Sequence, residues 1–433
     1  MERLLLIAVR NLRSNPRRTG LLTAAIASVT MLLVLLAALS HGMYDTMLRA
    51  ATTMATGHVN VGGFYKVTSG TAAPIVIQSD ALKKTVEALT PEATLIVDRM
   101  RGWGKVVSHK DSIQVGYCGI DIDEEQDFHE VIQILEGDLQ ALREKNSAVI
   151  FRSQAEALGV TVGDSLTLST PTFRGARNTA DVRVVAIAKP VGMLSAFNIF
   201  VHKQLVRELY HLDKHATGAI QLYLEDEDDV DKVAERLRAA LTEAGHKVMD
   251  PLAQPFFMKI PIVTREDWTG QRLDVTNWKD EMAFMMWTLK ALDALTGIIV
   301  AILLTLIVMG VMNSMWIAIR ERTREIGTLR AIGMQRRRVL FMFVLEAAVL
   351  SIFATLLGAF VGAGITVLVN ALEIAIPDGA RLFLMSDTLR LVMDGPIVLR
   401  AVVTITAITT AFSFIPAWRA ARLPPVTAIH DLG

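Results

Sequence analysis

The stretch Gly20–Ser40, GLLTAAIASVTMLLVLLAALS, decides the fold, because its 21 residues include no charged side chain. A helix of about 20 apolar residues crosses a hydrocarbon core about 30 Å thick. In lipid, only a helix satisfies every backbone amide within a single segment. Three further runs are similar: Leu295–Ile319, Leu340–Val369 and Ile397–Pro416. The sequence therefore predicts four transmembrane helices; the alternative is a large soluble protein with buried apolar helices.

Composition favours the membrane interpretation. The 433 residues are 52% hydrophobic, and the mean hydropathy of +0.39 is high for a soluble protein. The first run follows positive charges, as a signal peptide does, but a signal has only about 7 to 15 apolar residues. This run is longer and continues into HGMYDTMLRAATTM. We therefore expect a retained span rather than a cleaved signal.

Arginines are concentrated in the segments at one end of the apolar runs, which predicts the orientation of the spans in the membrane. They gather before the first run, between the second and third, and after the fourth: Arg3, Arg10, Arg13, Arg17 and Arg18; Arg320, Arg322, Arg324, Arg330, Arg336, Arg337 and Arg338; Arg419 and Arg422. Basic residues accumulate on the cytoplasmic side, where they also meet anionic lipid headgroups. The sequence thus predicts a multi-pass membrane protein with both termini cytoplasmic; that the membrane is the cell inner membrane is implied by a family resemblance.

The expected organisation has a large water-facing domain between the first two spans. In order, and with the segment roles that a family resemblance implies, we predict a cytoplasmic amphipathic N-terminal helix (1–19), the first span (20–42), a periplasmic α/β domain with stalk ends (43–285), the second span and stalk (286–319), a cytoplasmic coupling helix (320–338), the third span (339–372), a short periplasmic loop (373–396), the fourth span (397–416) and a cytoplasmic tail (417–433).

The region from about Thr56 to Glu281 alternates β-type runs with polar helical segments, which predicts a mixed α/β domain. Asp80 and Asp229 are expected as helix N-caps. The lone cysteine, Cys118, allows no internal disulfide, so core burial must stabilise the domain.

No catalytic or metal-binding set is predicted in this domain. Its histidines are scattered without metal-ligand spacing, and a lone histidine is usually an ordinary surface or core residue. The acidic clusters Asp121–Asp127 and Glu225–Asp229 resemble calcium loops in composition but lack the glycine and spacing of an EF-hand. We expect both clusters to be solvated turns, and we expect no nucleic-acid partner.

Two segments of the domain are candidate contact sites. The run SLTLSTPTFRGARNTADVRVVAI predicts a β-hairpin with an exposed basic tip, where Phe173, Arg174 and Arg177 either contact a partner protein or form an ordinary loop. The approach to the second span is rich in Met and aromatic residues. Such residues anchor a helix at the membrane interface; alternatively, Met282, Met285 and Met286 form an entry route for an acyl chain.

The segment Ile319–Gly333, IRERTREIGTLRAIG, predicts a short amphipathic helix between the second and third spans. Ile326, Leu329 and Ile332 form an apolar stripe at helical spacing, surrounded by charges. Gly333 is a suitable C-terminal cap. By itself this pattern indicates only that a partner or lipid headgroups dock here.

Three segments together resemble the FtsX-like, or MacB-type (type VII), ABC transporter permeases. The segment Arg324–Gly333 resembles the coupling-helix signature of that family, Ala8–Thr19 its N-terminal amphipathic helix, and Pro416–Ile429 its tail after the fourth span. Within the domain, GHVNV from Gly57 and ALGVTVGDSLTL from Ala157 are similar to family segments.

The resemblance implies a homodimer or heterodimer of permeases bound to a cytoplasmic dimer of a separate ABC ATPase. The sequence has no GxxxxGK[ST] phosphate loop, so we expect no enzyme activity or cofactor in this chain and ATP-Mg on the partner. The resemblance further implies that spans one and two carry motion to the periplasmic domain. The residues assigned to ATPase coupling are Arg324, Glu325, Gly327, Leu329, Arg330 and Gly333, with Glu325 and Arg330 as polar contacts.

Within this family the chain is most similar to lipoprotein-releasing (LolC/LolE-like) permeases, which hand acylated proteins to a periplasmic chaperone. The expected function is extraction of lipoproteins from the outer leaflet of the inner membrane. Two alternatives stay open: tripartite-type efflux or secretion with a periplasmic adaptor, and a non-transporting relay that activates a periplasmic enzyme.

Overall fold

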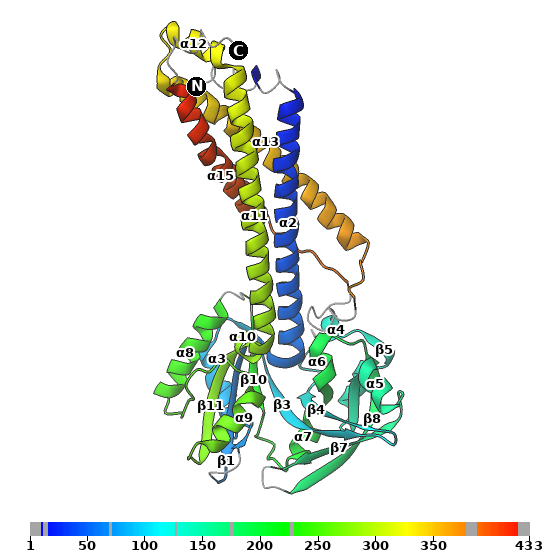
Figure 1. Cartoon of the computed structure of the whole chain (residues 1–433). Coiled ribbons are helices and arrows are strands. Elements are labelled where there is room, and N and C mark those ends of the chain that lie inside the picture. The colour runs from blue at the N-terminus through cyan, green and yellow to red at the C-terminus, as the bar shows by residue number, and fades with distance from the viewer. Residues whose placement is uncertain are drawn as a thin grey trace. The chain divides into compact units, whose positions relative to one another are not determined.

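The computed structural model describes residues 10–11, 16–68, 72–125, 128–172, 176–225, 229–377 and 388–422. The chain divides into two compact units (Figure 1). Unit 1 comprises Met1–Asp45, Leu289–Ala375 and Thr388–Gly433, and unit 2 comprises Thr46–Thr288 and Ile376–Asp387. Two of the boundaries between them fall within helices, one in α2 (Pro16–Ala51) and one in α11 (Ala283–Glu321).

Unit 1 is helical and supplies the predicted membrane spans. Besides its parts of α2 and α11, it contains α12 (Thr323–Ala331), α13 (Arg336–Ala371) and α15 (Gly395–Ala421). Four helices of the described chain are long and apolar enough to cross a membrane, with mean hydropathies of 2.5, 2.7, 2.4 and 1.8 in chain order. The predicted fold class, four transmembrane helices with an α/β domain between the first two, is confirmed.

Close packing in unit 1 depends on small and hydroxylated residues of α13. A Cβ on Gly358 would lie 2.3 Å from the carbonyl oxygen of Ala27, and one on Gly362 would lie 3.3 Å from Val34, so α2 and α13 approach closely. On α15, Thr409 shares a hydrogen bond of 2.7 Å with Ser351. Such contacts hold helices together where lipid removes the hydrophobic driving force.

Within its described residues, unit 2 is built on one mixed sheet of 11 strands. The path is β11-β1-β10-β3-β4-β9-β6-β8-β5, with β2 paired to β1 and β7 paired to β3 and β8. The strands are β1 (Val59–Lys66), β2 (Ala72–Ala73), β3 (Ala93–Val107), β4 (Ser112–Ile120), β5 (Ile134–Gly137), β6 (Ser147–Phe151), β7 (Ser165–Pro171), β8 (Arg177–Ala188), β9 (Asn198–His202), β10 (Ala219–Leu224) and β11 (Gly270–Asn277).

The long strand β3 joins two halves of this sheet. Its first part pairs with β10, from Ala93 to Arg99, and its second part pairs with β4, from Met100 to Val107. The helices of the unit are α3 (Ser79–Leu89), α4 (Phe128–Val131), α5 (Arg152–Leu158), α6 (Gly192–Phe197), α7 (Lys203–Leu209), α8 (Val230–Glu243), α9 (Phe256–Arg265) and α10 (Trp278–Glu281), with short turns η1 (Thr52–Thr56) and η2 (Leu139–Arg143). In Figure 1, α3, α8 and α9 lie with the β11-β1-β10 half, and α5, α6 and α7 with the other half.

Helical periodicity explains why α8 covers the sheet. Val230, Val233, Ala234, Leu237 and Leu241 are its buried residues, spaced three or four apart as one face of a helix requires. That face packs on β1 and β11.

Several local predictions hold and others are wrong. The predicted hairpin is present as β7 and β8, in register from Ser165–Arg183 to Pro171–Arg177. Asp229 is the N-cap residue of α8, although its side chain makes no capping hydrogen bond. Asp80 is not an N-cap, because α3 begins at Ser79 and Gln78 is its N-cap residue.

Candidate functional site

The predicted coupling segment forms a short helix, α12, between α11 and α13. Ile326 and Gly327 are its buried residues and Leu329 is half-buried, whereas Arg324 and Glu325 are exposed. Gly333 has φ +103°, a conformation that favours glycine, which ends the helix as predicted. The predicted apolar stripe is wrong at one end: Ile332 is 80% exposed, because the helix ends at Ala331 and this residue lies beyond it.

Arg322, just before α12, connects this helix to α13. Its Nε donates to Glu325 Oε2 at 2.9 Å, and an Nη donates to Glu346 Oε2 at 3.2 Å. The Glu346 side chain is only 6% exposed, and Arg18 of α2 approaches its other oxygen at 3.9 Å. A buried carboxylate therefore fixes the start of α12 against two other helices.

The other end of α12 is held by Arg330, which was predicted as an ATPase contact. Its guanidinium donates to the carbonyl oxygen of Ala421, the last residue of α15, at 2.8 Å. Arg330 is thus engaged within unit 1. Arg324 and Glu325 remain the exposed charged groups of the helix that were assigned to coupling.

In unit 2, a second cluster anchors η1, the turn that follows α2. Arg99 of β3 donates to the carbonyl oxygen of Thr53 at 2.7 Å, and Gln221 donates to that of Ala55 at 3.0 Å. The hydroxyl of Tyr223 donates to the carbonyl oxygen of Thr52 at 3.1 Å. Three side chains from two adjacent strands therefore satisfy the carbonyl groups at the end of this helix, as a buried helix terminus requires.

Arg99 is itself neutralised by Glu125. Its Nε lies 3.0 and 2.9 Å from the two carboxylate oxygens, and the two side chains are 2% and 4% exposed. Burial lowers the pKa of Arg99, but interactions with Glu125, Tyr223 and Cys118 together outweigh burial and raise it. The prediction that Asp121–Asp127 is a solvated turn is wrong at Glu125, because this carboxylate pairs with a buried guanidinium.

A third cluster lies near η1, where the chain enters α11. Glu281 of α10 accepts hydrogen bonds from the Thr276 hydroxyl at 2.9 Å and from the Phe256 backbone at 3.1 Å. The fully buried Lys259 pairs with Asp274 at 2.8 Å. Burial raises the pKa of Asp274 and outweighs the opposing effect of Lys259. These contacts fix α9 to β11 and to the chain that enters α11.

Unit 2 contains an apolar cavity of about 310 Å³ beside both of these clusters. It is lined by residues of η1, β3, β4, α6, α9 and α10, among them Trp103, Tyr117, Phe197, Phe256, Phe257 and Met258. Arg101 and Glu281 also line it. Cys118 faces this cavity, and burial raises the pKa of its thiol to about 11.

Of the methionines predicted as an acyl-chain entry route, the structure brings one to this cavity. Met282 lines it and is 4% exposed. Met286 is half-buried in α11 and is not among the lining residues. The Met285 side chain lies outside the described residues.

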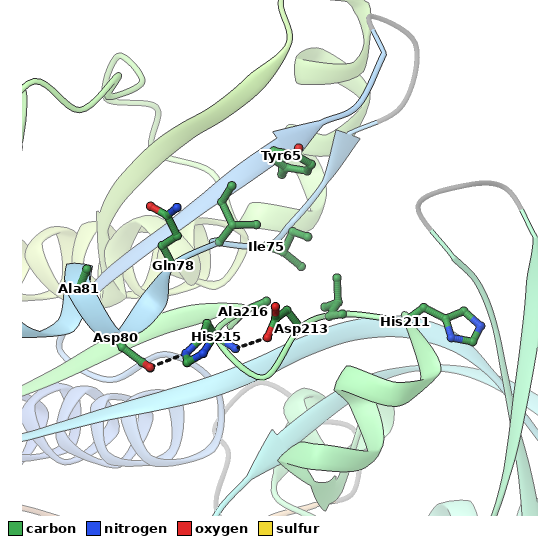
Figure 2. Close-up of a pocket in the computed structure, with 11 residues that line it drawn as sticks. Tyr65, Ile75, Gln78, Asp80, Ala81, His211, Asp213, His215 and Ala216 are labelled. Atoms are coloured by element: carbon green, nitrogen blue, oxygen red, sulfur yellow. Dashed lines mark hydrogen bonds and ion pairs between the residues drawn. The ribbon is translucent and has the colours of Figure 1, made fainter.

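A larger hollow of about 580 Å³ lies elsewhere in unit 2 and is more polar in character (Figure 2). His215 pairs with Asp80 at 2.6 Å and its backbone amide donates to Asp213, while His211 lies apart from this pair. The side chains of His215 and Asp80 are 48% and 67% exposed. Since water reaches both groups, this pair is a surface contact.

The remaining predicted contact residues were assigned to the tip of the predicted hairpin. Phe173 and Arg174 lie outside the described residues, and Arg177 opens β8 with an exposed side chain. No group of three or more His, Cys, Asp or Glu side chains within the described ranges is placed to hold a metal ion.

Two family models match the chain. The model for the MacB-like periplasmic core domain matches residues 19–240, about half of the chain, and the model for the FtsX-like permease C-terminal region matches residues 297–425. The first match covers α2 and most of unit 2, and the second covers α12, α13 and α15 with most of α11.

Among curated proteins, the uncharacterized ABC transporter permease YvrN of Bacillus subtilis is 34% identical over 136 residues, or 31% of this chain and 30% of that protein. The macrolide export ATP-binding/permease protein MacB of Bordetella avium is 37% identical over 142 residues, 33% of this chain and 20% of that protein. The matches thus span less than a third of these relatives. The solved periplasmic region of MacB from Actinobacillus actinomycetemcomitans is 11% identical, with a TM-score of 0.31, over 53% of this chain and 94% of that one.

Proposed function

The chain belongs to the family of permeases that combine a MacB-like periplasmic core domain with an FtsX-like C-terminal region, and from this premise we propose that it converts ATP hydrolysis by a separate ABC ATPase into movement of its α/β domain. The observation that carries this proposal is α12, a short helix held between membrane helices by Arg322 and Arg330. Its exposed Arg324 and Glu325 supply charges for docking to the ATPase.

Motion of α12 reaches other helices through the buried charge cluster. Because Glu346 contacts both Arg322 and Arg18, displacement of α12 moves α13 and α2 with it. At the far end of α2, the hydrogen bonds of Arg99, Gln221 and Tyr223 transfer that motion to the sheet. In this mechanism the chain acts as a lever, and cargo need not pass through a central channel.

We propose that unit 2 lies in the periplasm, that the termini lie in the cytoplasm and that two permeases form a dimer. The proposed cargo is a lipoprotein, extracted from the outer leaflet of the inner membrane and passed to a periplasmic chaperone. The apolar cavity beside the end of α10 supports a lipid-linked cargo.

Reconstitution with the cognate ATPase in proteoliposomes that contain a triacylated lipoprotein tests this function. The expected result is ATP-dependent appearance of the lipoprotein in the soluble fraction, bound to the chaperone. Release that does not depend on ATP, or failure with several lipoproteins while the ATPase remains bound and active, would reject lipoprotein release.

Export with a periplasmic adaptor is the second candidate, favoured by the names of matched relatives. These include macrolide export proteins and the pyoverdine export protein PvdT of Pseudomonas fluorescens, which is 34% identical over 142 residues. ATP-dependent efflux of a small amphipathic molecule, without lipoprotein release, would favour this candidate. Activation of a periplasmic enzyme without any transport would favour the relay.

A further inference from the structure

The apolar cavity of unit 2 combines features that select one class of ligand. Five aromatic residues and three methionines are among its lining residues. Methionine side chains are flexible and fill irregular spaces, so they adapt to a flexible ligand. Its volume of about 310 Å³ lies at the small end of ligand cavities.

Several apolar lining residues are exposed to solvent. Trp103 is 45% exposed, Phe197 50%, Phe257 43% and Met258 44%. Scattered exposed apolar side chains are normal on a protein surface, whereas a group of them around one cavity marks a binding site. These four residues come from three elements, β3, α6 and α9, so their proximity is a product of the tertiary fold.

The two charged residues of the lining are already compensated. Arg101 lies 3.8 Å from Glu281, and their side chains are 7% and 4% exposed. Arg101 also donates to Asn60 at 2.9 Å and stacks over the Phe256 ring at 4.8 Å. A ligand that brings a full charge into this site therefore loses its hydration without gaining a free counter-charge.

We propose that this cavity binds one acyl chain against its aromatic and methionine lining, with no charged group of the ligand inside the site. A water molecule occupies about 30 Å³ in the liquid. A methylene group has a similar volume, so the cavity has room for a chain segment of about ten carbons. It accommodates part of one chain and not a whole lipid. This inference rests on the proposed lipid-linked cargo and assigns the site that holds it.

Photolabelling of the full chain in lipid nanodiscs, without ATPase or ATP, tests the site directly. The probe is a neutral palmitoyl amide with a diazirine near the chain terminus, and adducts are located by peptide mass spectrometry. We expect adducts on Met193–Phe197 or Phe256–Met258, suppressed by excess unlabelled palmitoyl amide, in addition to adducts on the membrane helices. The corresponding free acid, charged at neutral pH, should label these segments more weakly.

Two substitutions on α9 provide a matched pair. Phe257→Asp places a charge in the cavity lining and should lower the adducts there about tenfold or more, whereas the membrane-helix adducts stay constant. Ile262→Asp is the control, because Ile262 is 42% exposed on the same helix but does not line the cavity. Adducts confined to membrane helices, or equal cavity labelling in both variants, would overturn the proposal.

The test separates this inference from the proposed function. ATP-dependent lipoprotein release by a chain whose cavity takes no probe rejects the acyl site and leaves the function standing. Saturable cavity labelling supports the acyl site even where ATP-driven release fails.

Discussion

Replacing Glu125 by Gln removes the charge that compensates the buried guanidinium of Arg99. The substitution preserves side-chain size, but leaves a cation that is 2% exposed without its counter-ion. Arg99 also holds the carbonyl oxygen of Thr53 at the end of the first membrane helix. The substitution therefore weakens the attachment of that helix to the sheet.

The expected magnitude follows from burial. Breaking a buried ion pair by removing one partner costs about 3–5 kcal/mol, which corresponds to about two to three and a half powers of ten in an equilibrium constant. An exposed pair contributes at most about 1 kcal/mol. Glu136→Gln is the matched control, because Glu136 and its partner Arg152 are 46% and 41% exposed.

Hydrogen–deuterium exchange of the full chain in detergent measures the effect locally. Amides of η1 and the paired strands β3 and β10 should exchange about a hundredfold faster or more in Glu125→Gln, and less than about fivefold faster in Glu136→Gln. The double variant Arg99→Met/Glu125→Leu should recover much of the protection of β3 and β10, since a buried pair is replaceable by apolar residues, but not that of η1, because it also removes the hydrogen bond to Thr53. Equal exchange in both single variants would refute the assigned role of the buried pair.

Three further outcomes are expected. Burial lowers the pKa of His58, so just below pH 6.5 the unfolded chain binds a proton that the folded chain does not. The free energy of unfolding should therefore decrease as the pH is lowered, by at most about 1.4 kcal/mol per pH unit from this group. The variant His58→Gln should remove that share of the pH dependence in urea titrations. Burial raises the pKa of the Cys118 thiol to about 11. The thiol should therefore react slowly with iodoacetamide at pH 7.5, and the rate should rise about tenfold per pH unit toward pH 11. A rate that levels off near pH 8.5 would contradict its burial. Glu346→Gln should leave ATPase binding intact but reduce ATP-driven cargo release, because it breaks the contact between α12 and α13; unchanged release would show that this cluster transmits no motion.

The four spans were predictable because membrane insertion depends on local composition. Each run, such as Gly20–Ser40, carries its own signal, and the α/β domain follows from alternating helical and strand patterns. The hairpin was predictable for the same reason, since β7 and β8 are adjacent in sequence. The end of α12 was predictable because Gly333 follows the helix.

The buried polar clusters and the cavity were not predictable from local patterns. Glu125 lies in an acidic run typical of a solvated turn, and only the fold brings it to Arg99. Arg330 has the charge of a docking residue, but its partner Ala421 is 91 positions away. The cavity lining extends from Ala55 to Met282, so no window of the sequence contains the site.

The most direct test of the lever mechanism is co-purification of the cognate ATPase with permease variants. Glu325 is 65% exposed, and its partner Arg322, which is 15% exposed, also pairs with Glu346, so in Glu325→Lys the start of α12 should stay attached to α13. We expect the ATPase to co-purify with the unmodified chain and with the control Glu156→Lys on exposed α5, but not with Glu325→Lys, although all three insert equally into the membrane. Equal recovery of the ATPase with all three would contradict docking through α12.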